Sequence, residues 1–226
     1  MIQSYKIDSL KMDIKNLSKK TLDFTVKRVA EIIGILLISI SVLLFIAFFS
    51  YSPEDPNFIF SDNINVSNFL GFKGSYASDF FFQSIGLASF LISITIFFTG
   101  INLVKNKKFL IIFENVFYSI TYSIVGTFFL TSFYKNSFVF SINGNGGFVG
   151  IFFQNTFFSN LINLNLNISY YSIIIIVIFL FLVSINFNIL FIKNLFLILK
   201  KIKKKDTHIH DNIQYEAEII SENSEK

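Results

Sequence analysis

The sequence has no cysteine, only two prolines and few charged residues among its 226 positions. Without cysteine there can be no disulfides, no thiol catalysis and no thiolate metal sites. Charged residues make up 15% of the chain, whereas soluble domains average about 25%. Hydrophobic residues make up 53% and the mean hydropathy is +0.61, so the composition indicates that lipid is the main solvent. We interpret the 32 phenylalanines mainly as lipid-facing filler.

The sequence also lacks the signatures of common active sites. No glycine is followed by lysine, so the phosphate loop GxxxxGK[ST] is absent from these residues. The pattern GxGxxG begins at Gly144 and Gly146 but is not completed, because Val149 stands at its last position. No cluster of His, Asp or Ser of a catalytic type lies in or beside the apolar stretches. We therefore predict no enzyme, no cofactor and no metal site in this chain.

Four stretches are apolar and long enough to cross a membrane as helices. A crossing needs about 20 mainly apolar residues, because the hydrocarbon core is about 30 Å thick. The predicted spans are residues 32–49, 80–104, 109–133 and 168–192. The expected fold class is an all-α integral membrane protein, with a four-transmembrane-helix bundle within residues 27–195.

A shorter apolar segment precedes the last predicted span. Within residues 147–162, the stretch from Gly147 to Phe158 is apolar but too short to cross. It is either an interfacial helix or a re-entrant piece packed against the bundle. We favour the interfacial interpretation.

Lysine and arginine are distributed unevenly among the loops. They precede the first span, separate the second from the third and follow the fourth, as Lys6, Lys11, Lys15, Lys19, Lys20, Lys27, Arg28, Lys105, Lys107, Lys108, Lys193, Lys200, Lys201, Lys203, Lys204 and Lys205. The other two loops hold one each, Lys73 and Lys135. Because positively charged loops stay in the cytoplasm, we predict a multi-pass inner-membrane protein with both termini cytoplasmic.

The two ends of the chain are polar. Residues 1–26 are predicted to be a cytoplasmic basic segment, either a short helix on the inner leaflet or a solvated tail. Residues 196–226 are basic as far as Lys205 and acidic beyond it. Their composition is too poor in apolar residues to favour order, so we expect a disordered cytoplasmic linker.

One carboxylate, Glu114, lies inside a predicted span. We expect it to reach toward the interface or to pair with Lys107 and Lys108, in preference to forming an ion or proton site. Glu31 and Asp79 stand at predicted helix starts, where a carboxylate complements the helix dipole. Neither Glu31 nor Asp79 therefore requires a chemical role.

Small residues recur four positions apart within the second and third spans. Examples are Ser89 with Ser93, and Ser119 with Ser123 and Thr127. Such spacing lets helix backbones approach closely in a membrane. We favour packing within one bundle over a subunit interface.

Three stretches carry a resemblance to a known family. Residues 50–58, SYSPEDPNF, resemble the SYSPxDPxW/F signature that closes the first helix of the FtsK/SpoIIIE-type DNA translocases. Residues 68–79, NFLGFKGSYASD, look like that family's NxxGxxGAxxAD loop, and residues 146–150, GGFVG, are similar to its GGxxG element. The matching positions are Ser52, Pro53, Asp55, Pro56, Asn68, Gly71, Gly74, Asp79, Gly86, Gly146, Gly147 and Gly150.

The resemblance covers residues 25–195 and has two departures. Ser75 stands where the family usually has alanine, and no tryptophan occurs. The family's motor, with its phosphate loop, and its winged-helix domain are absent from these residues. The resemblance thus implies the membrane domain of a translocase and the first part of a linker. Independently of the family, Pro53 and Pro56 are expected to stop the first helix.

The function implied by the resemblance is that of a membrane anchor, which targets a DNA-pumping motor to the division septum in cell division and chromosome segregation. The implied partners are the lipid bilayer, membrane proteins of the division machinery and further copies of the chain joined through the motor, with no direct nucleic acid contact. The alternative is a small transporter or channel, which would need several polar residues around a shared cavity. Asn102, Asn186 and Asn188 lie near span ends and Glu114 stands alone, so we favour the anchor.

Overall fold

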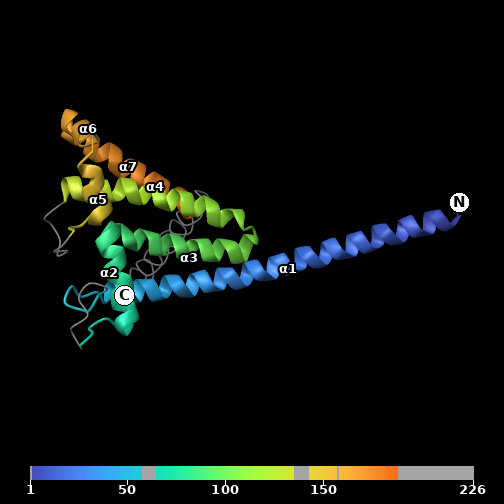
Figure 1. Ribbon diagram of the computed structural model, residues 1–226. Coiled ribbons are helices and arrows are strands. Elements are labelled where there is room, and N and C mark those ends of the chain that lie inside the picture. The colour runs from blue at the N-terminus through green and yellow to red at the C-terminus, as the bar shows by residue number, and fades with distance from the viewer. Residues whose placement is uncertain (1, 58–64, 135–142, 157, 188–226) are drawn as a thin grey trace, which may run out of the picture. The chain divides into compact units, whose positions relative to one another are not determined.

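The first predicted span is the C-terminal part of a much longer helix. The computed structural model describes residues 2–57, 65–134, 143–156 and 158–187, and in it helix α1 runs from Ile2 to Phe49 (Figure 1). No proline precedes Pro53, so the backbone can stay helical from the basic segment into the apolar one. Residues 2–26 are therefore continuous with the span. Glu31 lies inside α1 and not at a helix start, which corrects the predicted role of its carboxylate.

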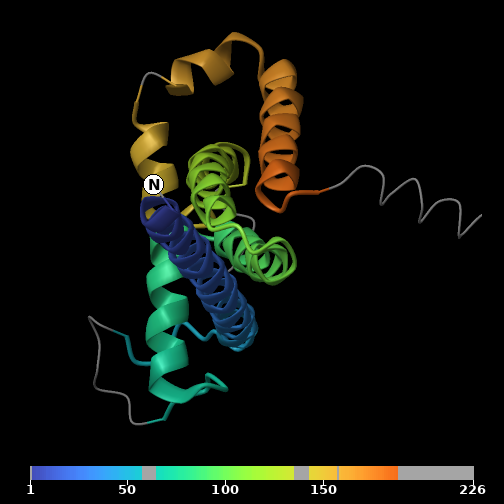
Figure 2. The ribbon, with the colours of Figure 1, turned by 90° about the vertical axis from the view of Figure 1, so that its right-hand side faces the viewer.

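The second predicted span, residues 80–104, is divided in the structure. Helix α2 runs from Gly71 to Ile85 and helix α3 from Ala88 to Asn106, with Gly86 between them at a φ of 56°. The two views of the ribbon show α2 running across the direction of α1 and α3 (Figures 1 and 2). The chain can turn sharply at Gly86 because glycine reaches this φ without the steric cost that other residues have. The apolar run continues through the turn and gives no sign of it.

The remaining helices follow the predicted order. Helix α4 runs from Leu110 to Phe133, close to the predicted 109–133. The short helices α5, Gly147–Gln154, and α6, Phe158–Leu164, precede α7, which runs from Leu166 to Ser184. The N-terminus of α7 is capped by Asn165, whose Oδ1 accepts the backbone N–H of Ile168 at 3.1 Å.

The all-α membrane fold class is confirmed. All regular elements among the described residues are helices, and four of them are long and apolar enough to cross a membrane: Leu17–Phe49, Ala88–Asn106, Leu110–Phe133 and Leu166–Ser184. Helix α7 ends at Ser184, earlier than the predicted 192, and Asn186 follows with a φ of 52°. The predicted linker, residues 196–226, lies outside the described residues. Whether α5 and α6 are interfacial or re-entrant stays a prediction.

The most extensive contact between described helices is the one between α1 and α3, and small residues make it possible. A Cβ atom on Gly34 would lie 2.8 Å from the carbonyl oxygen of Gly100, so no larger residue fits there. The hydroxyl of Ser41 donates to the Ser93 carbonyl at 2.7 Å, and that of Ser93 donates to the Ser41 carbonyl at 3.1 Å. Such bonds between close backbones are typical of helices associating in lipid. Ser93 therefore serves packing inside the bundle.

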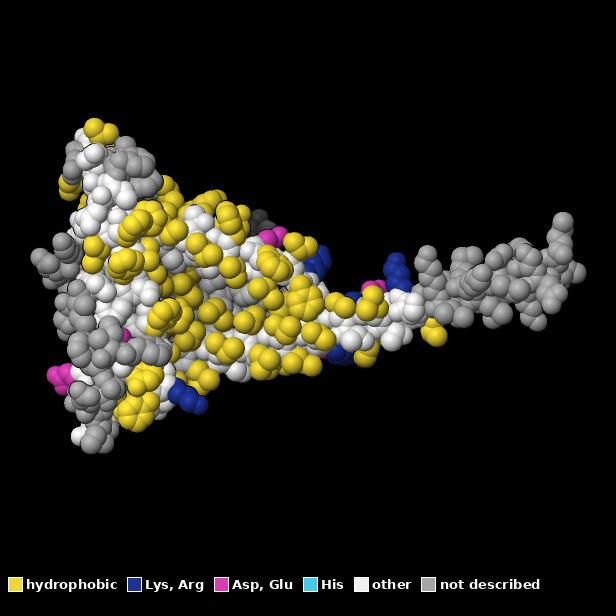
Figure 3. All heavy atoms as spheres, viewed as in Figure 1, with side chains coloured by type: hydrophobic (Ala, Val, Ile, Leu, Met, Phe, Trp, Pro, Cys, Tyr) yellow, Lys and Arg dark blue, Asp and Glu magenta, His cyan; other side chains and the backbone are white. Residues whose placement is uncertain are grey.

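The distribution of polarity is that of a protein dissolved in lipid. Large apolar side chains such as Ile35, Leu43 and Phe113 are exposed, and hydrophobic side chains cover much of the visible face of the helices (Figure 3). Most of the buried side chains of α3 are small, and several are hydroxylated, for example Ser89 and Thr95. The apolar surface is thus turned outward, as a bilayer requires.

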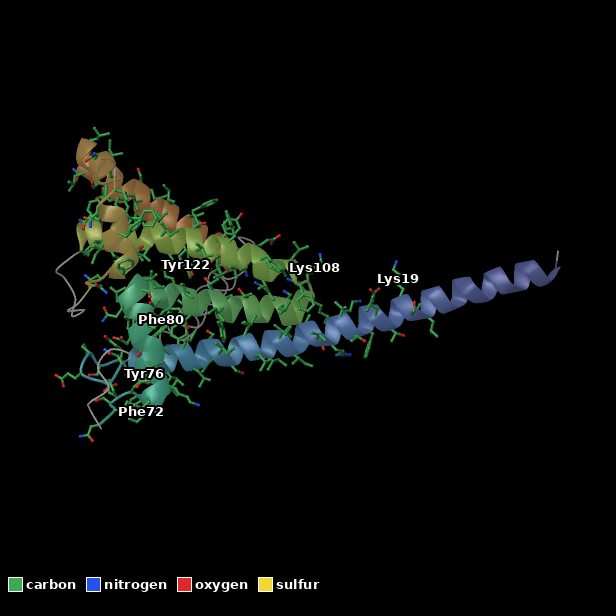
Figure 4. All side chains as sticks on the ribbon, in the orientation of Figure 1. Lys19, Phe72, Tyr76, Phe80, Lys108 and Tyr122 are labelled. Atoms are coloured by element: carbon green, nitrogen blue, oxygen red, sulfur yellow. The ribbon has the colours of Figure 1, made fainter. Side chains whose placement is uncertain are left out.

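The turn between α3 and α4 lies at one end of the bundle, where Figure 4 labels Lys108. We call this end, which carries Arg28, Lys105, Lys107 and Lys108, the lysine end. The carboxylate of Glu31 pairs there with the Nζ of Lys107 at 2.5 Å and with Nη1 of Arg28 at 2.6 Å. Lys107 therefore pairs with Glu31 and not with Glu114. Glu114 is exposed on α4, and whether it reaches toward the interface stays a prediction.

Candidate functional site

The three motif stretches gather at the other end of the bundle, which we call the motif end: residues 50–57, 65–86 and 143–150. The first two stretches meet through Asp55, which is buried. Its carboxylate accepts the backbone N–H of Ser67 at 2.7 Å and that of Asn68 at 2.9 Å. Hydrogen bonds to a carboxylate are stronger than neutral ones. Asp55 therefore fixes the start of the second motif beside the end of the first.

Asn68 closes the end of α1. Its Nδ2 donates to the carbonyl of Ala47 at 2.9 Å and to that of Ser50 at 3.3 Å, which are carbonyls left unpaired where the helix ends. Its Oδ1 accepts the backbone N–H of Leu70 at 3.1 Å. A Cβ on Gly74 would lie 2.1 Å from this Oδ1. The motif thus needs glycine at 74 so that the amide of Asn68 can reach α1.

The departure at Ser75 has a structural explanation. Its hydroxyl donates to the carbonyl of Pro56 at 2.6 Å, and the side chains of both residues are fully buried. Serine therefore adds a hydrogen bond between the first and second motifs that alanine could not make. The change is compatible with the packing of this end.

Asp79 lies in the middle of α2 and not at the start of a helix, so the predicted dipole role is wrong. Helix α2 starts at Gly71, whose N–H donates to the carbonyl of Asn68 at 2.8 Å. The carboxylate of Asp79 instead accepts from the Tyr51 hydroxyl at 3.2 Å and from Nε2 of Gln83 at 3.3 Å. Burial and the nearby Asp79 carboxylate raise the pKa of the Tyr51 hydroxyl well above its ordinary value. Tyr51 therefore remains a donor at neutral pH.

The second and third motifs meet at the turn between α2 and α3. The carbonyl of Asn145 accepts the N–H of Leu87 at 2.9 Å, and a Cβ on Gly86 would lie 1.9 Å from the same oxygen. A Cβ on Gly147 would likewise lie 2.6 Å from the backbone nitrogen of Ile85. Two stretches of backbone pass here at a distance that only glycine permits.

The third motif also docks α5 on α4. A Cβ on Gly146 or on Gly150 would lie 2.0 Å or 2.1 Å, respectively, from the hydroxyl oxygen of Thr131. The two glycines are four positions apart and so share one face of the chain as α5 begins. The sequence marked these glycines through the family resemblance, but their use as a helix contact was missed.

Phenylalanines fill the space beneath these hydrogen bonds, although the sequence favoured a lipid-facing role for them. The ring of Phe48, in α1, lies 5.5 Å from Phe81 and 5.2 Å from Phe82 in α2, and 5.6 Å from Phe90 in α3. Phe48 and Phe82 are buried. The adjacent pair Phe81 and Phe82, next to Asp79 of the motif, was the signal that could have revealed this cluster.

A chain of polar contacts joins α3, α4 and α7 within the bundle, and sequence reasoning missed it. The hydroxyl of Thr95 contacts that of Tyr122 at 2.9 Å and that of Ser184 at 3.0 Å. All three residues are buried. The hydroxyls come from three different helices, so the contact holds the helices together where lipid could not.

The polar chain continues toward the lysine end. Nδ2 of Asn115 donates to the hydroxyl of Thr99 at 2.8 Å, and Nδ2 of Asn186 donates to Oδ1 of Asn115 at 2.8 Å. These groups bind one another. An apolar pocket of about 360 Å³ between α4 and α7 is lined by other residues, among them Ile124, Phe128 and Ile173. The arrangement therefore favours helix packing over a path for a solute.

Comparison with known proteins gives a consistent result. A family profile described as "4TM region of DNA translocase FtsK/SpoIIIE" matches residues 26–196. The chain is 39% identical over 79 residues to the DNA translocase FtsK of Rickettsia bellii, which is 34% of this chain and 10% of that protein. It is 36% identical over 69 residues to the DNA translocase FtsK of Rickettsia prowazekii, which is 30% of this chain and 9% of that protein. These matches span about a tenth of the length of the curated relatives. No solved structure matches the chain.

Proposed function

Because the chain belongs to the family of the 4TM region of DNA translocase FtsK/SpoIIIE, we propose that it anchors a DNA translocase motor at the division septum of a bacterial inner membrane. The observation that carries the proposal is the assembly of the three family motifs at one end of the bundle. Asp55 and Asn68 join the first two, and Gly86 and Asn145 join the second to the third. Such a shared, ordered end, built from loops, is what a contact with other division proteins would use.

The proposed orientation places the lysine end in the cytoplasm and the motif end outside. Lys105, Lys107 and Lys108 lie in one short turn, and short basic loops resist translocation. Within residues 50–87, by contrast, Lys73 is the one basic residue. The motor would then follow residues 187–226 on the cytoplasmic side, where DNA is found.

The proposed mechanism is tethering. An anchor that holds several motors in a small area of membrane raises their effective concentration for assembly. The motif end would select that area by contacting membrane proteins of the division machinery. The motor would bind DNA and hydrolyse ATP, and this segment would contact neither DNA nor ATP.

The test of location is a fusion of residues 1–226 to a fluorescent protein in dividing cells. We expect enrichment at mid-cell, and we expect the Asp55→Ala variant to lose it while remaining in the membrane. The matched control is Glu114→Gln, which changes an exposed carboxylate on α4 and should leave the enrichment unchanged. A uniform membrane signal from the unaltered chain would contradict septal targeting.

The test of orientation uses the absence of cysteine. A single cysteine at Ser67, which is exposed at the motif end, should react with a membrane-impermeant maleimide added to whole spheroplasts. A single cysteine at Ser18, exposed in the polar half of α1, should react only after the cells are opened. The reverse pattern would overturn the proposed topology without bearing on the location test.

A further inference from the structure

A groove lies between α1 and α2 at the motif end. It has a volume of about 350 Å³, and most of its lining is apolar. Ile40, Leu43 and Ala47 line it from α1, and Ala77 lines it from α2. Ile40 and Leu43 are about half exposed and belong to a span that faces lipid. The groove therefore opens toward the hydrocarbon region and not toward water alone.

One cation, Lys73, lies at this groove. It lines the groove from the first turn of α2 and is exposed. No ion pair joins Lys73 to a carboxylate in the described part of the chain. The N-terminus of α2, which starts at Gly71, adds partial positive charge at the same place. The apolar groove thus ends beside a positive charge that has no partner within those residues.

The depth of α2 in the bilayer fits this arrangement. Phe72, Tyr76 and Phe80 recur four positions apart along α2, and Figure 4 labels them in order along the helix. Phe72 and Phe80 are exposed. A helix that runs across the spans and exposes phenylalanine rings is typical of helices that lie in the membrane interface. Lys73 would then lie near the depth of the lipid phosphates.

We propose that this groove binds one anionic phospholipid. Its phosphate would lie beside Lys73 and the first turn of α2, and one acyl chain would follow α1 from Ala47 toward Ile40. These seven residues of helix correspond to about 10 Å, enough for the upper part of an acyl chain. A free phosphate has no apolar part to fill the groove. A zwitterionic lipid fills it equally well but gains less from the lysine, because its headgroup carries no net charge.

The proposal is tested by native mass spectrometry of residues 1–226 in a neutral detergent, with phosphatidylglycerol or phosphatidylcholine of identical acyl chains. We expect preferential retention of one phosphatidylglycerol. Lys73→Gln should weaken its binding by about fivefold, the effect of removing one lysine near an anionic lipid. Lys73→Arg should restore binding. Ala77→Phe, which fills the groove, should weaken the binding of both lipids.

The matched control is Lys108→Gln, which removes an exposed lysine at the lysine end and should leave the strongest phosphatidylglycerol site unchanged. Equal retention of the two lipids by the unaltered chain would overturn the proposal, since it would mean apolar adsorption only. A loss on Lys108→Gln as large as the loss on Lys73→Gln would overturn it too. Because the measurement is made in detergent, its outcome is independent of septal targeting.

Discussion

The two ends of the bundle are held together by different kinds of interaction. At the motif end, buried groups such as Asp55 and Asn68 bind backbone N–H and C=O groups of other segments. At the lysine end, a short turn joins α3 to α4, and Glu31 pairs with two partly exposed cations, Arg28 and Lys107. Buried bonds to the backbone depend on one geometry, whereas exposed ion pairs contribute little and tolerate change. Substitutions at the motif end should therefore cost far more than those at the lysine end.

The sharpest way to break the motif end is Gly86→Val. The new side chain would overlap the carbonyl of Asn145 and would adopt an unfavourable positive φ. We expect a loss of about 3 kcal/mol or more in stability, with little folded protein recovered. Size-exclusion chromatography and thermal unfolding in detergent measure both. Gly126→Ala is the control, because a Cβ there makes an ordinary contact at 3.8 Å with Val177 and should be tolerated.

Asp55→Ala should have the next largest effect. It leaves the N–H groups of Ser67 and Asn68 without their carboxylate acceptor in a buried place. We expect a loss of about 2–3 kcal/mol, together with faster hydrogen exchange at these two amides. Glu54→Ala changes the neighbouring, exposed carboxylate and should alter neither quantity by much. Equal effects of the two substitutions would mean that Asp55 does not order this end.

Ser75→Ala sharpens the comparison within the motif end. It removes the hydrogen bond to the Pro56 carbonyl. Alanine is the usual residue of the resembled family at this position, so the fold should be kept. We expect a loss of about 1 kcal/mol in thermal stability. Ser119→Ala, which removes a bond only to the α4 carbonyl of Val116, should change stability by less. A stabilising effect of Ser75→Ala would contradict the role given to this hydroxyl.

The smallest effect is expected at the lysine end, from Glu31→Gln. Its carboxylate pairs with side chains that are 57% and 36% exposed, so solvent screens both interactions. We expect a small loss of stability at low salt, and a still smaller one at high salt. Thermal unfolding at two salt concentrations measures the difference. A large loss of stability that is the same at both salt concentrations would contradict the difference between the lysine end and the motif end.

The number and order of the four spans could be predicted from the sequence because apolar length is a direct physical requirement of the bilayer. It could not reveal the turn at Gly86, since the run of apolar residues continues through it and the reason for the turn, the Asn145 carbonyl, lies about 60 positions away. It also could not place Glu31 or Asp79, because both roles depend on where a helix starts. The contact between Thr95, Tyr122 and Ser184 could not be predicted either, because it depends on how three helices pack together.

The residues that carry the family resemblance were found from the sequence, but their partners were not. Asn68, Gly74 and Gly150 could be named from the resemblance to the family's motifs, whereas their contacts with α1 and α4 required the fold. A motif reports which positions are constrained. It does not report which distant segment imposes the constraint.

The unbroken course of α1 has a mechanical consequence. Its 48 residues make a helix of about 70 Å that contains no proline, so a tilt applied near Ile2 would be carried along the helix toward Phe49. There the amide of Asn68 binds the carbonyl of Ala47 in the last turn, so the tilt would also displace the segment around Asn68. The continuous helix thus provides a mechanical connection between the polar segment and the motif end.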